Sequence, residues 1–215
     1  MTAARYRLVF FDVDSTLVTI EGIDELADGN EEIVRLTEAA MNGQIPLDQV
    51  YARRLEIIRP DRRRVEELAK QYQSSLVEGA GETIRALRDA GAAVHLVSAG
   101  IEQAILPLAR HLGLDERVVH AVPLRFASDG AYEDFDRRSL LARPGGKEIV
   151  VRDIRTRSHG RAAFIGDGVS DLEARPAVDL FIGYGGVQVR PRVRDNADVF
   201  IEERDLRAVL RHLIE

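Results

Sequence analysis

Cysteine and tryptophan are absent from the 215-residue sequence, and lysine is nearly absent. Without cysteine, the chain forms no disulfide and offers no thiolate ligand to a metal. Such a composition suits the reducing cytoplasm, where we expect this protein to reside. Arginine supplies most of the positive charge, because only Lys70 and Lys147 are lysines among the 30 basic residues. A lysine at a special position is therefore improbable by chance.

A positive net charge and long hydrophobic runs are also missing. The formal net charge is -6, which disfavours nucleic acid as a partner because its phosphates call for a basic face. A small anionic substrate stays possible, since the local charge of a site can oppose the net charge. We find no apolar stretch long enough to cross a bilayer and no signal-peptide pattern. We expect a monomer or homodimer that contacts no membrane.

Four short apolar runs predict the strands of a parallel sheet. They span residues 8–11, 93–97, 162–165 and 178–182. Continuous apolar runs of this length are typical of strands buried on both faces. Helices are predicted from amphipathic patterns at 81–90, 101–112, 146–157 and 205–214. The alternation indicates a doubly wound, Rossmann-like α/β fold, in which ligands bind beyond the carboxyl ends of the strands.

The segment 18–78 departs from this alternation. Its apolar residues have helical spacing throughout, and it contains no good buried strand. We therefore predict two domains, a Rossmann-like core of residues 1–17 and 79–215 and a helical cap of residues 18–78 inserted after the first strand. A small hairpin is predicted at 126–132, where Asp129 and Gly130 supply the turn.

Two aspartates follow the first predicted strand. Asp12 and Asp14 are separated by one residue, and at a strand-to-loop turn both carboxylates can approach one point. Neighbouring carboxylates repel each other unless a cation or a proton lies between them. Oxygen ligands without cysteine or clustered histidine favour Mg²⁺. An isolated Asp-x-Asp pair is also typical of a helix cap or a solvated turn, so the pair alone leaves both interpretations open.

A second acidic turn follows another predicted strand. Asp167 falls at the strand end and Asp171 lies one helical turn further on, while Gly166 and Gly168 permit a tight turn. Capping of the next helix is again the alternative interpretation. Two acidic turns at neighbouring strand ends nevertheless favour a site for a divalent cation.

Ser98 and Lys147 have surroundings suited to an anion. Ser98 and Gly100 precede the helix predicted from residue 101, and a helix N-terminus offers a hydroxyl and backbone N–H groups. Lys147 begins another predicted helix, where its charge opposes the macrodipole and calls for a phosphate or carboxylate partner. Taken singly, a helix cap and a solvated lysine are the plainer interpretations.

Together, these residues predict a site for phosphoryl transfer. One carboxylate attacks phosphorus, and a metal and Lys147 neutralise the phosphoryl oxygens. The second carboxylate, Asp14, can protonate the leaving oxygen and then activate water, which cleaves the resulting acyl phosphate.

The four motifs occur in an order that is informative in itself. They are Asp-x-Asp-Ser-Thr at 12–16, Ser-x-Gly at 98–100, Lys147, and Gly-Asp-Gly-x-x-Asp at 166–171. In this order they resemble the haloacid dehalogenase superfamily. Further stretches resemble its phosphoserine phosphatases, namely 11–17, 21–27, 40–43, Arg54-Leu55, 181–186, Arg190 and 195–197. The likeness covers nearly the whole chain.

The resemblance implies Mg²⁺-dependent hydrolysis of O-phosphoserine through an aspartyl phosphate, the last step of serine biosynthesis. It implies that Asp12 is the nucleophile and Asp14 the general acid/base. The implied metal ligands are Asp12, the backbone carbonyl of Asp14, and Asp167, with Asp171 supporting the metal. The phosphoryl group is expected at Ser98, Gly100 and Lys147. The expected substrate contacts are Glu21 for the ammonium group, Arg54 for the carboxylate, and Met41, Ser170 and Arg190 nearby.

Two positions depart from the family pattern and keep alternatives open. Asn42 and Ala99 stand where the family often has glycine, and Asn42 adds a side chain near the expected substrate contact. Another phosphomonoester, or phosphoryl transfer to an amino-acid hydroxyl, is therefore a second hypothesis. A receiver-type signalling domain is a third, although a receiver has neither the acid at Asp14 nor an inserted cap. An inactive binding protein is disfavoured because every expected catalytic side chain is present.

Overall fold

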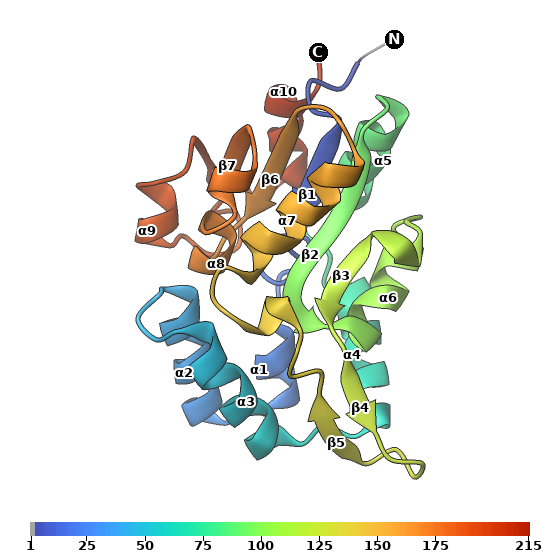
Figure 1. The fold of residues 1–215 in the computed structure, drawn as a ribbon, viewed down its shortest axis with the longest axis vertical. Helices are drawn as coiled ribbons and strands as arrows, with labels where there is room; N and C mark the ends of the chain where they lie inside the picture. The colour runs from blue at the N-terminus through green and yellow to red at the C-terminus, as the bar shows by residue number, and fades with distance from the viewer. Residues whose placement is uncertain (1–2) are drawn as a thin grey trace.

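The computed structural model describes residues 3–215 and contains a six-stranded parallel sheet with the strand order β3-β2-β1-β6-β7-β8 (Figure 1). The six strands are β1 (Leu8–Phe11), β2 (Ala93–Ile101), β3 (Val119–Val122), β6 (Ala162–Gly166), β7 (Leu180–Tyr184) and β8 (Val199–Ile201). The predicted doubly wound α/β class is thus confirmed. Stacked phenyl rings of Phe10, Phe164 and Phe181 cross the middle of the sheet, with centroids 6.3 and 6.1 Å apart.

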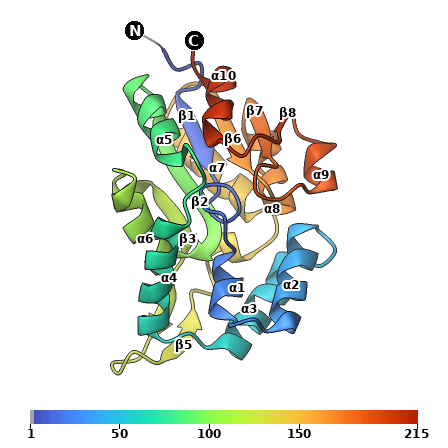
Figure 2. The same cartoon turned by 180° about the vertical axis from the view of Figure 1, so that it is seen from behind.

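Helices cover both faces of this sheet. Helices α7 (Gly146–Arg157) and α8 (Val169–Leu172) lie in front of it in Figure 1, and α5 (Ala80–Asp89) and α10 (Leu210–Leu213) lie on the opposite face, which Figure 2 brings forward. The remaining helices of this part are α6 (Glu102–His111) and α9 (Pro191–Arg194). Among the described residues, no helix combines the length and the apolar character that crossing a membrane requires.

Four helices stand beyond the carboxyl ends of the strands. They are α1 (Gly22–Leu26), α2 (Glu31–Met41), α3 (Leu47–Ile58) and α4 (Arg62–Ser74). The chain enters and leaves this group side by side, because Val18 forms an antiparallel bridge with Leu76 and Val77 N–H donates to Leu17 at 2.9 Å. The helices therefore form one insertion after β1. The assignment of 18–78 as a separate domain stays a prediction.

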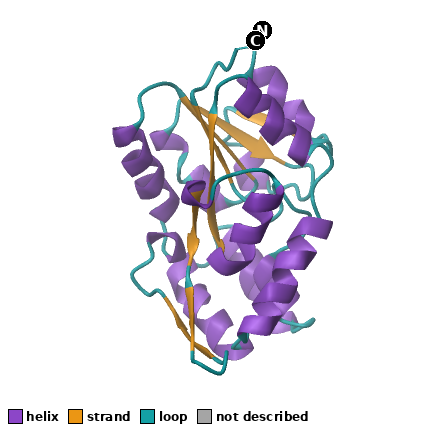
Figure 3. Cartoon of the chain, turned by 90° about the vertical axis from the view of Figure 1, so that its right-hand side faces the viewer, coloured by secondary structure: helices purple, strands orange, loops and turns teal. Residues whose placement is uncertain are grey.

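The predicted hairpin is confirmed as β4 (Leu124–Phe126) paired antiparallel with β5 (Tyr132–Phe135). Seen from the side, it lies at the end of the molecule far from the two termini (Figure 3). Its Phe135 packs edge-on against Tyr51 of α3 at 5.1 Å, and Gly130 accepts a hydrogen bond from Arg62 N–H at 2.9 Å. The hairpin, which belongs to the core, therefore contacts the cap helices α3 and α4 and helps to hold them in place.

Three local predictions need correction. Strands β3 and β8 are absent from the sequence prediction, because they are short edge strands of four and three residues with no long apolar run. Strand β2 continues to Ile101 instead of ending at residue 97, so Ser98 and Gly100 belong to the strand. The helix predicted at 205–214 is a 3₁₀ turn (Leu206–Val209) followed by the short α10.

Candidate active site

The register of the sheet brings the predicted polar turns to one edge. Phe11, the last residue of β1, lies opposite Leu96 of β2 and Ile165 of β6. Asp12 therefore emerges between Ser98 on one neighbour and the turn after β6 on the other, and its N–H donates to Ile165 at 3.0 Å. Adjacent parallel strands in register place their following residues side by side, which explains the convergence.

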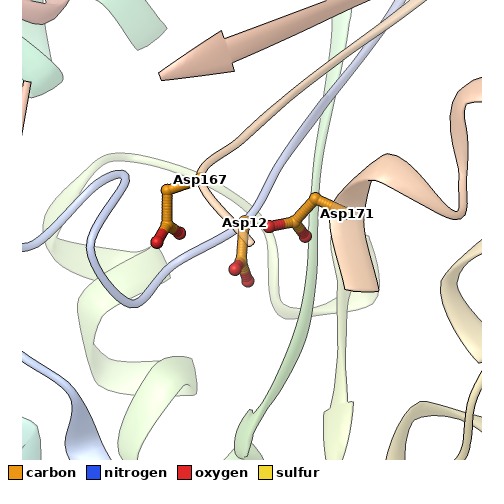
Figure 4. Close-up of side chains that lie close together, drawn as sticks. All are labelled: Asp12, Asp167 and Asp171. Atoms are coloured by element: carbon orange, nitrogen blue, oxygen red, sulfur yellow. The ribbon is translucent and has the colours of Figure 1, made fainter. Parts of the chain in front are cut away.

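Three aspartates form a compact buried cluster at this edge. Asp12, Asp167 and Asp171 each offer a carboxylate oxygen, and these oxygens all lie within 4.8 Å of one another (Figure 4). The residues are only 3%, 1% and 0% exposed. Gly166 makes this approach possible, since a Cβ there would lie 2.4 Å from Asp171 Cγ. Asp14 does not join the cluster with its carboxylate, and the role of its backbone carbonyl stays a prediction.

The cluster is suited to a metal cation. Burial raises the pKa of Asp167 to about 7 and that of Asp171 well above its ordinary value, and the neighbouring carboxylates add to both shifts. Buried, mutually repelling oxygens that are costly to ionise are the environment that a bound divalent cation stabilises. The donors are oxygens alone, which fits a hard cation.

Lys147 contacts two members of the cluster from the first turn of α7. Its Nζ lies 2.9 Å from Asp12 Oδ1 and donates a hydrogen bond to Asp171 Oδ1. Burial alone would lower the pKa of Lys147, but Asp12 and Asp171 together raise it above its ordinary value. The lysine is thus a permanent cation, and the carboxylate partner expected for a lysine at a helix N-terminus is present.

Arg190 contacts the cluster from the other side. Its Nε donates to Asp167 Oδ2 at 2.9 Å, its Nη2 donates to Gln188 at 3.0 Å, and Nη2 lies 3.5 Å from Glu21 Oε1. Arg190 is 2% exposed. Its expected place beside the substrate stays a prediction, and among the described residues its Nη1 has no hydrogen-bond partner. Arg190 therefore holds Asp167 and reaches Glu21.

Ser98 faces the same space but does not begin a helix. The helix predicted from residue 101 begins at Glu102 with Ile101 as its N-cap, so Ser98 and Gly100 lie before it without capping it. The Ser98 hydroxyl accepts a hydrogen bond from Gly100 N–H at 3.0 Å within the bent end of β2. This correction changes how Ser98 and Gly100 reach the pocket, because the strand, and not a helix cap, positions them.

One pocket collects the predicted side chains of core and cap. It is lined by Asp12, Asp14, Glu21, Met41, Arg54, Ser98, Gly100, Lys147 and Ser170, together with Ile23, Thr37, Ala40, Leu47 and Ala99. Asp167, Asp171 and Arg190 are buried outside this lining. The cap therefore closes a chamber above the acidic cluster.

Asp14 is held from the cap. Its Oδ1 accepts hydrogen bonds from the Tyr72 hydroxyl at 2.6 Å and from Gly22 N–H at 3.3 Å. Burial raises the pKa of Asp14 to about 7, while the Tyr72 hydroxyl acts in the opposite direction. A carboxyl group with a pKa near neutrality can both give and take a proton, as a general acid/base must.

Glu21 and Arg54 place one acidic and one basic side chain in the chamber. Glu21 accepts a hydrogen bond from the Ser15 hydroxyl at 2.7 Å, and burial raises its pKa to about 8. Arg54 is 4% exposed and donates through Nη1 to Thr37 Oγ1 at 2.8 Å, and Thr37 in turn donates to Asp24. Among the described residues, no group accepts from Arg54 Nε. A buried guanidinium with an unused N–H is suited to a carboxylate ligand.

The side chain of Asn42 turns away from the chamber. Its Nδ2 donates to Glu38 O on its own helix at 2.9 Å. Arg192 of α9 donates to Gly43 O at 3.0 Å and lies 3.3 Å from Asn42 O, which ties the end of α2 to the core. The departure at Asn42 therefore places no amide among the pocket residues.

Sequence reasoning missed Tyr72, Thr37 and Ser15 as site residues. Tyr72 and Thr37 occupy buried positions of amphipathic helices, where the pattern indicates only core packing. Ser15 has a left-handed backbone with φ of 52°, which is unusual for a residue other than glycine and often occurs at functional turns. Ser15 lies inside the motif at 12–16, which was the available signal, whereas no sequence signal separates Tyr72 and Thr37 from ordinary core residues.

Comparisons with known proteins agree on one family. The model of the haloacid dehalogenase-like hydrolases matches residues 9–174. Phosphoserine phosphatase of Bos taurus is 36% identical over 199 residues, which cover 91% of this chain and 88% of that protein. Its counterpart from Methanocaldococcus jannaschii is 30% identical over 213 residues, covering 96% and 97%. A solved phospho-aspartyl intermediate analogue of phosphoserine phosphatase superposes with a TM-score of 0.85 at 30% identity, covering 97% and 99%.

Proposed function

The chain belongs to the haloacid dehalogenase-like hydrolases, and from this membership we propose that it hydrolyses O-phosphoserine to serine and phosphate through a phosphoaspartate at Asp12. The observation that carries the proposal is the pocket that joins Asp12 and Lys147 of the core to Glu21 and Arg54 of the cap. The similarity to phosphoserine phosphatases over nearly the whole chain supports it. Family membership removes the receiver-type alternative.

The first half-reaction forms a phosphoenzyme. A carboxylate oxygen of Asp12 attacks phosphorus, and the bond from phosphorus to the serine oxygen breaks. Lys147, 2.9 Å from Asp12, offsets charge on the phosphoryl oxygens. Asp14 gives its proton to the departing serine oxygen, so that serine leaves as the neutral alcohol.

The second half-reaction returns the enzyme to its starting state. Water attacks phosphorus of the acyl phosphate, Asp14 accepts a proton from that water, and the Asp12 carboxylate is released with inorganic phosphate. We propose that Mg²⁺ binds Asp12, Asp167 and the backbone carbonyl of Asp14, with Asp171 supporting the site. When bound, the cation withdraws charge from the phosphoryl oxygens.

The chamber provides one partner for each charge of the amino-acid part. We propose that Arg54 pairs with the substrate carboxylate, Glu21 with its ammonium group, and Met41 and Ser170 line the remaining wall. Arg190 holds Asp167 through Nε, and among the described residues its buried Nη1 has no hydrogen-bond partner, so we propose that it also stands near the substrate. We also propose that residues 18–78 form a cap domain on the core of residues 1–17 and 79–215. We further propose that the protein is a monomer or homodimer and acts in the cytoplasm.

A substrate series tests this function directly. Phosphate release is measured with O-phospho-L-serine, with phosphoethanolamine, which lacks the carboxylate, and with 3-phosphooxypropionate, which lacks the ammonium group. We expect kcat/KM for phosphoserine to exceed both by about 100-fold or more, because each analogue leaves a buried charge unpaired. Activity should require Mg²⁺ and disappear in EDTA. Equal rates across the series would reject phosphoserine as the substrate.

Arg54→Ala isolates recognition of the carboxylate. We expect KM for phosphoserine to rise by about 30-fold, with a smaller change in kcat, because truncating one partner of a buried charge pair costs about 2–5 kcal/mol. KM for phosphoethanolamine should stay within about twofold of wild type. The matched control is Arg53→Ala, since Arg53 is the adjacent residue of α3 but is exposed and pairs with Glu32. An unchanged KM for phosphoserine would indicate a different substrate.

A further inference from the structure

Tyr72 is a buried hydroxyl residue of the cap that contacts the proposed general acid/base. The side chain is 0% exposed, and its hydroxyl donates to Asp14 Oδ1 at 2.6 Å from a position 58 residues away in the sequence. Gly22 N–H donates to the same oxygen at 3.3 Å. Two groups of the cap thus hold one oxygen of the carboxyl group.

The other oxygen of Asp14 faces the phosphoryl side of the chamber. A Cβ built on Gly100 would lie 3.3 Å from Asp14 Oδ2 and 3.2 Å from Ser98 Oγ. Oδ2 therefore lies beside the residues proposed to bind the phosphoryl group. No residue of the described range donates a hydrogen bond to it. The two oxygens of one carboxyl group have different surroundings.

We propose that Tyr72 is a positioning residue, which fixes Asp14 Oδ1 so that Oδ2 is the atom that exchanges protons with the substrate. This inference rests on the proposed function. In the first half-reaction the Oδ2–H bond breaks and its proton bonds to the leaving oxygen. In the second, a proton from the attacking water returns to Oδ2. Oδ1 keeps its two hydrogen bonds throughout, and rotation of the carboxyl group is prevented.

The local packing is built around the phenol oxygen. A Cβ on Gly22 would lie 2.0 Å from Tyr72 Oη and 2.8 Å from its Cζ, so only glycine leaves space for the hydroxyl. Gly22 thus both donates to Asp14 and admits Tyr72. Because the hydroxyl reaches Asp14 only from α4, the acid is correctly aligned only while the cap is seated on the core.

Tyr72→Phe tests this role, because it removes the hydroxyl and keeps the ring. The readout is kcat/KM for phenyl, 4-chlorophenyl and 4-nitrophenyl phosphate, whose leaving groups differ in acidity but little in shape. A poorly aligned acid harms the least acidic leaving group most. We expect a loss of about 30-fold with phenyl phosphate and of less than about threefold with 4-nitrophenyl phosphate, so the dependence on leaving-group acidity becomes steeper.

The matched control is Tyr51→Phe. Tyr51 is equally buried in the cap, and within residues 3–215 its hydroxyl has no hydrogen-bond partner. In this variant, kcat/KM should depend on the acidity of the leaving group as it does in wild type. A loss in Tyr72→Phe that is equal for all three esters, or no loss, would overturn the inference and leave Tyr72 a packing residue. If Tyr72→Phe unfolds below the assay temperature, the three esters are compared for wild type and variant at a temperature below the unfolding midpoint of the variant.

These esters also separate the inference from the proposed function. They carry neither the ammonium nor the carboxylate of serine, so they report on the acid without involving Glu21 or Arg54. A wild-type enzyme that cleaves them but does not prefer phosphoserine would contradict the proposed substrate alone. An unchanged dependence in Tyr72→Phe would contradict the role of Tyr72 alone.

Discussion

Replacing Asp12 with asparagine is expected to reduce phosphate release from O-phosphoserine to below about one percent of wild type. The amide of asparagine is a much poorer nucleophile than a carboxylate and cannot form the phosphoenzyme. The change is nearly isosteric at a residue that is 3% exposed. The fold should persist, and the thermal unfolding midpoint checks this. The measurement is single-turnover phosphate release with Mg²⁺ present.

Trapping the intermediate makes this prediction specific to Asp12. Acid-quenched wild-type enzyme should carry a phosphoryl group on the peptide that contains Asp12, and the Asp12→Asn protein should carry none. Asp153→Asn is the control, since Asp153 belongs to α7 but pairs with Arg157 on the surface. Residual turnover above about one percent in protein free of deamidation, or a phosphoryl group on another residue, would contradict the assignment of the nucleophile.

Replacing Lys147 with methionine is expected to remove both activity and a large part of the stability. The methionine keeps the apolar stem, but Asp12 and Asp171 lose the cation that contacts both. Breaking a buried ion pair by removing one partner costs about 3–5 kcal/mol, because an uncompensated buried charge remains. Loss of charge stabilisation on the phosphoryl group should lower kcat by about 1000-fold.

The loss of stability in Lys147→Met is expected to depend on pH. In the wild type, burial holds the pKa of Asp171 above its ordinary value, and Lys147 opposes that rise. Without the lysine the pKa of Asp171 rises further above its value in the unfolded chain, and an acid whose pKa is raised by folding destabilises the fold as the pH rises above the unfolded value. The difference in the free energy of unfolding between wild type and Lys147→Met should therefore shrink as the pH falls and Asp171 becomes protonated in both proteins. Urea unfolding at pH 5 and pH 8 measures it.

Lys70 provides the matched control for this variant. It is the only other lysine of the sequence, and it lies exposed on α4. Lys70→Met should change the free energy of unfolding by less than about 0.5 kcal/mol and leave kcat unchanged. A Lys147→Met protein as stable as wild type at pH 8, or one equally destabilised at both pH values, would show that the lysine does not compensate the two aspartates.

The sequence predicted the parts of the fold that depend on local patterns. Buried parallel strands leave continuous apolar runs, as in β1 and β6, and the helix predicted at 146–157 is α7 with the same bounds. The short strands β3 and β8 leave no such run, and each takes its place at an edge of the sheet by pairing with the preceding strand, β2 and β7 respectively. Ser98 precedes α6 as predicted, but it belongs to a strand and not to a helix cap, because pairing with β3 extends β2 to Ile101.

The sequence by itself determined which residues of this protein can carry the chemistry, since the residue types, the spacing of Asp12 with Asp14 and of Asp167 with Asp171, and the order of the motifs are all local. Only the tertiary structure decided which groups touch. Strand register set Asp12 beside Asp171 and Lys147, and the return of α4 to the core set the Tyr72 hydroxyl on Asp14. Such contacts join residues tens of positions apart, and they depend on packing that no local pattern records.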